Sequence, residues 1–208
     1  MAPYMKGDSM RYLREHFNLI TKLFVNQIGM TIFGMILTMA VMKAAEDNPT
    51  LHMLVSLFAI LFYLCLIYNV MWEAGARNII RINAGRMPKD RAFALKAAFF
   101  ASVPNLVLAV FLAISYLLAY PLGVAAFAGV QDAFHLILGI FEAMYLGLFN
   151  VILSTCTSDA MKDLWATVLY LASSLPMILV SMGAYALGTR NVHLLGKREP
   201  KSKKITKD

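Results

Sequence analysis

The stretch LHMLVSLFAILFYLCLIYNVMW, residues 51–72, decides the fold class because it contains no acidic side chain, lysine or arginine. At 1.5 Å per residue an α-helix of this length measures roughly 33 Å, which is enough to cross the hydrocarbon core of a bilayer. Lipid offers no hydrogen bonds, so every backbone N–H and C=O in such a segment must be paired within the protein, as in a helix. The sequence shows no alternating ten-residue pattern of the kind that outer-membrane barrels have.

Similar apolar segments lie on both sides of this stretch. They are predicted at residues 23–42, 97–120, 133–155 and 165–187. The composition agrees, because 60% of the residues are hydrophobic and only 15% are charged. In soluble domains, about a quarter of the residues are charged. Residues 8–22 predict a short amphipathic helix, which is expected to lie on the membrane surface.

We therefore expect an all-α protein, a polytopic helical membrane bundle of about five apolar segments with an N-terminal amphipathic interfacial helix. Its predicted parts are an interfacial segment at 1–22, a transmembrane domain at 23–188 and a basic tail at 189–208.

The positive charges predict an orientation. Seventeen of the 19 lysines and arginines fall in three places: four before residue 23, six within residues 73–96 and seven after residue 188. Cationic segments resist translocation, so the N-terminus, residues 73–96 and the tail are predicted to be cytoplasmic. Beside membrane helices, such basic segments indicate contact with anionic lipid headgroups rather than with nucleic acid. We detect no cleavable signal peptide.

This orientation conflicts with the number of apolar segments. It requires an even number of crossings between residues 73–96 and the tail, but three apolar segments lie there. In the first alternative, residues 133–155 do not cross and form a re-entrant or tilted segment buried in protein. In the second, the charge-free stretch 97–130 bends back near Pro121 and Gly123. In the third, all five segments cross and the tail is outside.

The fourth apolar segment contains the most suggestive polar residues, namely Glu142, His135 and Asn150. Glu142 and His135 are seven residues apart and thus near one helical face. An ionisable group within a span is a candidate ion or proton site by default, and its structural alternative is a buried acid hydrogen-bonded to another helix. Small residues spaced by four (Gly139, Ala143 and Gly147) indicate close helix packing on the same segment.

A second cluster marks the predicted cytoplasmic end of the second span. It comprises Trp72, Glu73, Arg77, Asn78 and Arg81. Glu73 and Arg77 are four residues apart, as are Arg77 and Arg81, which predicts a salt-bridged continuation of the helix. We interpret the cluster as an anchor to lipid headgroups, with a docking surface for a soluble partner as the alternative.

Several kinds of chemistry have no signature in the sequence. Glycine-rich nucleotide loops, H-E-x-x-H, G-x-S-x-G and clusters of cysteine and histidine do not occur. Cys65 and Cys156 are far apart and lie in or next to apolar runs, which favours apolar fillers over a disulfide or metal pair. We expect no cofactor, no metal site and no catalytic residue.

Three short motifs carry a family resemblance. They are Asn26-Gln27-Ile28-Gly29-Met30 with Phe33-Gly34, Trp72-Glu73-x-Gly75 with Asn78, and Ala184-Tyr185-Ala186-Leu187-Gly188. Together they resemble a group of small bacterial multi-pass membrane proteins without an assigned activity. The resemblance implies a bacterial inner (plasma) membrane and transfers no site residues.

The sequence thus favours a non-enzymatic integral membrane protein, a subunit or accessory component of a transport or signalling complex, with a protein partner or a homo-oligomer. A small transporter or channel that uses Glu142 is the first alternative. An intramembrane enzyme acting on a lipid is the second, and it lacks a convincing second catalytic group.

Overall fold

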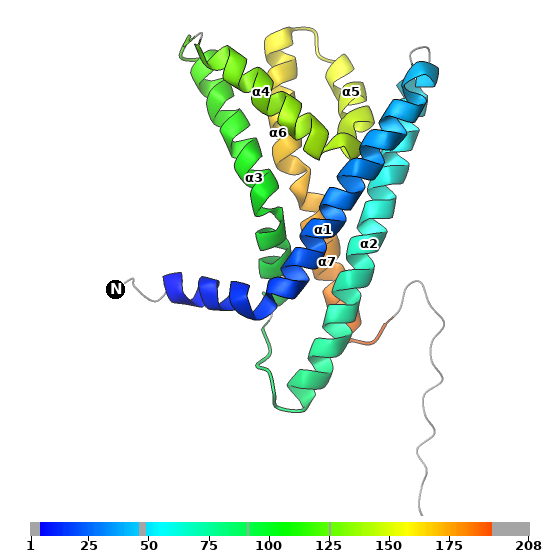
Figure 1. The fold of residues 1–208 in the computed structure, drawn as a ribbon, viewed down its shortest axis with the longest axis vertical. Helices are drawn as coiled ribbons and strands as arrows, with labels where there is room; N and C mark the ends of the chain where they lie inside the picture. The colour runs from blue at the N-terminus through cyan, green and yellow to red at the C-terminus, as the bar shows by residue number, and fades with distance from the viewer. Residues whose placement is uncertain (1–4, 46–48, 91, 125, 193–208) are drawn as a thin grey trace, which may run out of the picture.

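The computed structural model describes residues 5–45, 49–90, 92–124 and 126–192, which form helices without any strand. The helices are α1 (Met5–Ala45), α2 (Pro49–Asn83), α3 (Phe93–Ala119), α4 (Ala126–Phe141), the 3₁₀ turn η1 (Ala143–Tyr145), α5 (Leu146–Ser154), α6 (Asp159–Ala172) and α7 (Ser174–Thr189). The prediction of an all-α helical bundle is confirmed (Figure 1).

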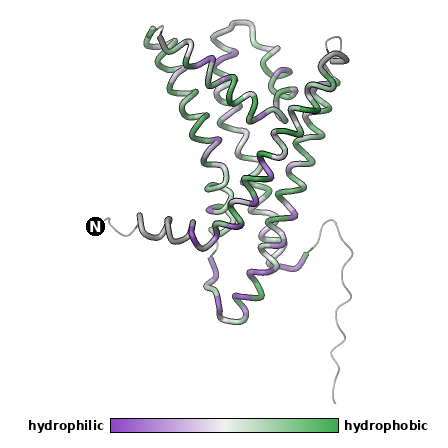
Figure 2. Tube along the Cα trace, viewed as in Figure 1, coloured by the Kyte–Doolittle hydropathy of each residue, from purple (hydrophilic) through white to green (hydrophobic). Residues whose placement is uncertain are grey.

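Within the described residues, four helical segments are long and apolar enough to cross a membrane. They are His16–Val41, Thr50–Asn83, Phe93–Ala119 and Met161–Thr189, the last of which joins α6 and α7. Their outward side chains are large and apolar, as Phe58 at 57% exposure and Leu179 at 67% illustrate. Figure 2 shows that hydrophobic residues dominate these helices, whereas hydrophilic residues gather in the connection between α2 and α3. Such extensive apolar exposure is that of a membrane protein.

The first helix differs from the prediction in its continuity. The sequence predicted an amphipathic helix at 8–22 followed by a separate span, but α1 runs from Met5 to Ala45 without a break. Its N-terminal part nevertheless projects sideways from the bundle, at a clear angle to the remainder (Figure 1). The His16 ring packs edge-on against Phe93 at 4.8 Å, which holds this part beside the start of α3. Its position at a lipid surface stays a prediction.

The fourth apolar segment is broken, and the break bears on the conflict in the number of crossings. The helical parts Gly129–Phe141 and Ala143–Ser154 meet at 83°. Helix α4 leads inward from the end of the bundle where α3 ends, and α5 leads back to the same end (Figure 1). The chain turns between α3 and α4 at Gly123, whose φ of +67° favours glycine. The geometry therefore favours the first alternative, a re-entrant hairpin.

With this hairpin, only α3 and the joined α6 and α7 run the length of the bundle between residues 73–96 and the tail. The end of α7 consequently lies beside the lower part of α2, at the same end as the connection between α2 and α3 (Figure 1). The indole Nε1 of Trp72 in α2 donates to the carbonyl oxygen of Val192 at 2.8 Å. At the opposite end, the Tyr120 hydroxyl donates to Asp163 Oδ2 at 2.7 Å and joins α3 to α6.

Helices α2 and α7 pack with their backbones in close contact. A Cβ added at Gly75 would lie 2.5 Å from the Tyr185 carbonyl oxygen, and one added at Gly188 would overlap the Trp72 carbonyl oxygen. In membranes, small residues permit this close approach, which adds van der Waals contact along both helices. These two glycines thus allow the close contact between α7 and α2.

Candidate functional site

Glu142 lies at the break between α4 and η1 and is buried, with 1% of its surface exposed. Its Oε1 accepts a hydrogen bond from Asn105 Nδ2 of α3. The Ser173 hydroxyl, between α6 and α7, lies 3.0 Å from the same oxygen and 2.8 Å from the Tyr170 carbonyl oxygen. The second carboxylate oxygen, Oε2, has no hydrogen-bond partner. The break therefore presents one satisfied and one unsatisfied carboxylate oxygen to the interior.

The two partners of Glu142 lie where their own helices are irregular. Asn105 follows Pro104, which lacks an N–H and so interrupts the hydrogen-bond ladder of α3. Ser173 lies at the junction of α6 and α7, three residues before Pro176. Asn105 Nδ2 also lies 3.4 Å from Ser173 Oγ and 3.5 Å from Ser174 Oγ. Two helix breaks and one proline-containing turn of α3 thus meet at one polar centre.

Side chains from α1 and α2 satisfy the backbone of the hairpin tip. The Thr31 hydroxyl donates to the Phe141 carbonyl oxygen at the end of α4, at 2.7 Å. The Gly147 N–H in the first turn of α5 donates to Ser56 Oγ at 2.8 Å. Helix ends leave such groups without intrahelical partners, and inside a membrane they must be paired by other parts of the protein. The tip is therefore built into the bundle rather than inserted loosely between its helices.

A glycine of α1 lets the tip approach closely. A Cβ at Gly34 would lie 2.8 Å from both Cα and N of Met144 in η1. Gly34 belongs to one of the motifs that carry the family resemblance, and this contact gives it a structural reason.

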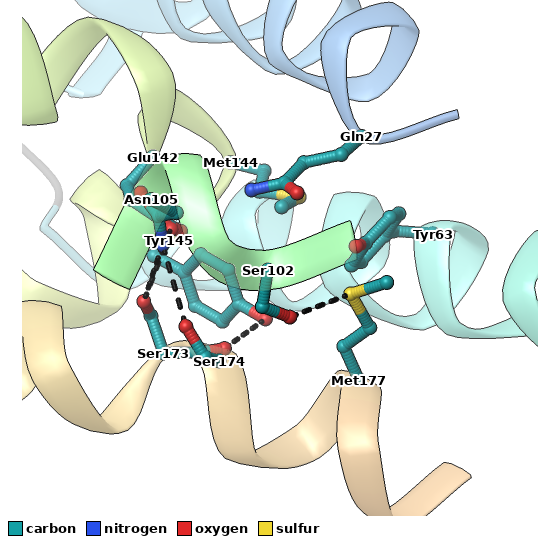
Figure 3. Close-up of a pocket in the computed structure, with 10 residues that line it drawn as sticks. All are labelled: Gln27, Tyr63, Ser102, Asn105, Glu142, Met144, Tyr145, Ser173, Ser174 and Met177. Carbon is teal, nitrogen blue, oxygen red and sulfur yellow. Dashed lines mark hydrogen bonds between the residues drawn. The ribbon is translucent and has the colours of Figure 1, made fainter. Parts of the chain in front are cut away.

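The polar centre borders a small internal cavity of about 10 Å³ (Figure 3). The lining residues are Gln27, Tyr63, Ser102, Asn105, Glu142, Met144, Tyr145, Ser173, Ser174 and Met177. Three oxygen atoms of these residues are buried without a hydrogen-bond partner: Gln27 Oε1, Asn105 Oδ1 and Glu142 Oε2. A volume of this order holds about one water molecule or one small ion.

The other two residues predicted with Glu142 lie elsewhere. The His135 ring packs edge-on against Tyr170 at 5.5 Å and lines a separate apolar groove of about 340 Å³ between α1 and α4. Asn150 lies on the exposed side of α5. Neither lines the cavity at Glu142. Glu142 was identified correctly as a buried polar residue of the fourth segment, but its neighbours are Asn105, Ser173 and Gln27.

The sequence did not assign Gln27, Asn105 or Ser173 to the site of Glu142. A signal was present, because each is a polar residue inside an otherwise apolar span. Polar residues in spans are costly in lipid and therefore face the protein interior. Sequence alone does not say which of them face each other.

The cluster at the end of α2 divides into exposed and buried residues. Glu73 and Arg77 form the predicted salt bridge, with 3.6 Å between Oε1 and Nη2, and Arg81 is exposed beside them. Asn78 is buried, and its Nδ2 donates to the Tyr185 hydroxyl at 3.3 Å. Asn78 thus belongs to the interface of α2 and α7 and is not available to a docking partner.

Both cysteines are free, and Cys65 is exposed on the bundle surface. Among the described residues, no group of three or more histidines, cysteines, aspartates or glutamates could hold a metal ion. No protein-family model, curated protein or solved structure matches the chain. The family resemblance and the bacterial setting consequently stay predictions, and function must be argued from the geometry.

Proposed function

We propose that the protein is a small non-enzymatic membrane transporter or channel component that binds and releases a cation or proton at Glu142. A carboxylate buried to 1% exposure at a helix break, inside a bundle of apolar helices, carries this proposal. Ionisable groups at such depth mark ion pathways, and broken helices form the ion sites of many transporters.

The arrangement around Glu142 supports exchange of an ion rather than covalent chemistry. Its nearest polar neighbours are an amide and hydroxyls, from Asn105, Ser173 and Ser174. These groups orient a carboxylate and can coordinate a cation, but they include no base beside a nucleophile. An enzyme acting on a lipid would also need a substrate site next to the carboxylate, and the cavity of about 10 Å³ has no room for one.

We propose further that the protein resides in a bacterial inner membrane, with its N-terminus, residues 73–96 and the tail in the cytoplasm. The common location of the described basic segments at one end of the bundle supports this orientation. The exposed Arg77 and Arg81 are placed to contact anionic headgroups there. A protein partner or a second copy of the chain, as expected for a subunit of a larger complex, stays a prediction.

Flux into liposomes tests the proposal. The purified chain is reconstituted with a pH-sensitive or a sodium-sensitive dye inside, and an ion gradient is applied. Wild type should move cations or protons faster than empty liposomes, and Glu142→Gln should abolish the difference. Glu73→Gln is the matched control, because it removes an exposed acid by the same substitution and should leave flux unchanged. Equal flux in Glu142→Gln and wild type would exclude Glu142 from transport.

A further inference from the structure

We propose that Glu142, Asn105 and Gln27 form a binding site for a single dehydrated sodium ion. The inference rests on the proposed role of Glu142 as an ion site and names the ion and its ligands. It starts from the three unpaired oxygen atoms around one cavity, Gln27 Oε1, Asn105 Oδ1 and Glu142 Oε2. Their residues are 6%, 2% and 1% exposed.

Buried oxygens without partners are rare because each forfeits the hydrogen bonds that it makes in water. The orientation of the Asn105 amide is fixed by its own contacts. Its Nδ2 donates to Glu142 Oε1, and exchanging the two amide atoms would place Oδ1 against that carboxylate oxygen. Oδ1 is therefore an acceptor without a donor, as is Glu142 Oε2.

A proton on Glu142 Oε2 would neutralise the carboxylate and could be donated to one of the other two oxygens, which leaves the third without a partner. A water molecule has two hydrogens to donate, which is one fewer than the three acceptors. A cation attracts all three oxygens at once and balances the carboxylate charge. A single bound cation therefore accounts for the whole set, with its ligands supplied by residues of α1, α3 and the hairpin tip that line the same cavity.

The chemistry of the lining selects the class of cation. Carboxylate, amide and hydroxyl oxygens are hard ligands that suit alkali and alkaline-earth ions and not the softer transition metals. Glu142 is the only carboxylate among the lining residues, so a monovalent ion gives a neutral site whereas a divalent ion leaves a buried net charge. The volume of about 10 Å³ is at the lower limit for a particle as large as water or potassium, and it leaves more room around the smaller sodium and lithium ions.

Ion binding is measured on the full chain in detergent, without any transport step. The melting temperature is recorded in sodium, lithium, potassium and choline chloride at constant ionic strength. A ligand that binds the folded state raises the melting temperature as its concentration increases. We expect sodium and lithium to raise it with saturation, and potassium and choline to have no such effect. Direct binding of radioactive sodium should give one ion per chain.

Variants assign the ligands. Glu142→Gln should abolish the sodium response, and Gln27→Met, which keeps the shape of the side chain without its oxygen, should weaken sodium binding by roughly tenfold or more. Gln131→Met is the matched control. Gln131 is also a buried glutamine with an unpaired Oε1, but it does not line the cavity. Its substitution should leave the sodium response unchanged.

The results separate this inference from the proposed function. Proton flux that depends on Glu142 without any sodium response in wild type would overturn the sodium site and leave the transport role intact. Sodium binding without flux would overturn transport and support the site. Equal losses in Gln27→Met and Gln131→Met would overturn the assignment of Gln27 as a ligand.

Discussion

Replacement of Gly188 by alanine should destabilise the bundle by separating α7 from α2. The added Cβ would overlap the Trp72 carbonyl oxygen and lie 3.0 Å from the Trp72 carbonyl carbon and 3.1 Å from the Ala76 nitrogen. All of these are backbone atoms of α2, so no side chain can rotate away. Optimal separations between carbon atoms are about 3.5–4.0 Å, and the helices must therefore move apart by about half an ångström or more.

The expected loss follows from two opposing effects. Overpacking of this kind costs roughly 1–3 kcal/mol, whereas alanine in place of glycine gains about 1 kcal/mol of helix propensity. Because the obstacles are backbone atoms, we expect the upper part of the overpacking range and a net loss of about 1–2 kcal/mol. For a chain of this length, each kcal/mol corresponds to about 2–4 °C in melting temperature.

Gly183→Ala on the same helix is the control, because a Cβ there would meet no atom within 4 Å. It should leave the melting temperature unchanged or raise it. Both variants are compared with wild type by thermal unfolding in the same detergent, with monodispersity followed by size-exclusion chromatography. A Gly188→Ala variant that melts together with Gly183→Ala would refute the close contact of α2 and α7.

Three further predictions concern other parts of the bundle. Burial raises the pKa of Asp90, but hydrogen bonds from Lys96 and the Ala92 N–H outweigh it and hold that pKa below its usual value. The ionised Asp90 therefore stabilises the fold above about pH 4, and this contribution is lost on further acidification. Melting curves of Asp90→Asn should lack this acid-dependent component. Ser56→Ala leaves a backbone N–H of α5 unpaired and should cost about 1–3 kcal/mol in an unfolding titration, whereas a loss near zero would contradict the cap. In sealed vesicles, a membrane-impermeant thiol reagent should label Leu122→Cys and Cys156 from one side and Arg86→Cys from the other, as mapped by mass spectrometry; labelling of the first two from opposite sides would exclude the re-entrant hairpin.

The helical class and most of the spans could be predicted because each span is decided locally. Residues 51–72 contain no acidic side chain, lysine or arginine, and the helix there follows from the lack of hydrogen-bond partners in lipid. The Glu73–Arg77 salt bridge was also predictable from local sequence, because the two residues lie four positions apart on one helix. The continuity of α1 through residue 22 was not predicted, because the change from an amphipathic to an apolar pattern was taken as a boundary although no turn residue lies there.

The hairpin and its polar centre depend on contacts between distant segments. Glu142 was identified within one segment, but Asn105 lies 37 residues before it and Ser173 lies 31 residues after it. His135 satisfied the helical spacing to Glu142, yet the break at Glu142 starts a new helix and the shared face ends there. Spacing predicts neighbours only while a helix continues.

The charge distribution and the hairpin support each other through independent physics. Counting basic residues required an even number of crossings, without identifying the segment that fails to cross. The structure supplies four polar side chains for the hairpin tip, one from each span: Thr31, Ser56, Asn105 and Ser173. A helix that crossed completely would pair its own backbone and would not need Thr31 at one helix end or Ser56 at the next. Each of these four polar side chains would then add a free-energy cost to its apolar helix without a partner that explains it. Their convergence on one tip favours a re-entrant fourth segment, in which polar side chains from all four spans hold the tip that carries Glu142.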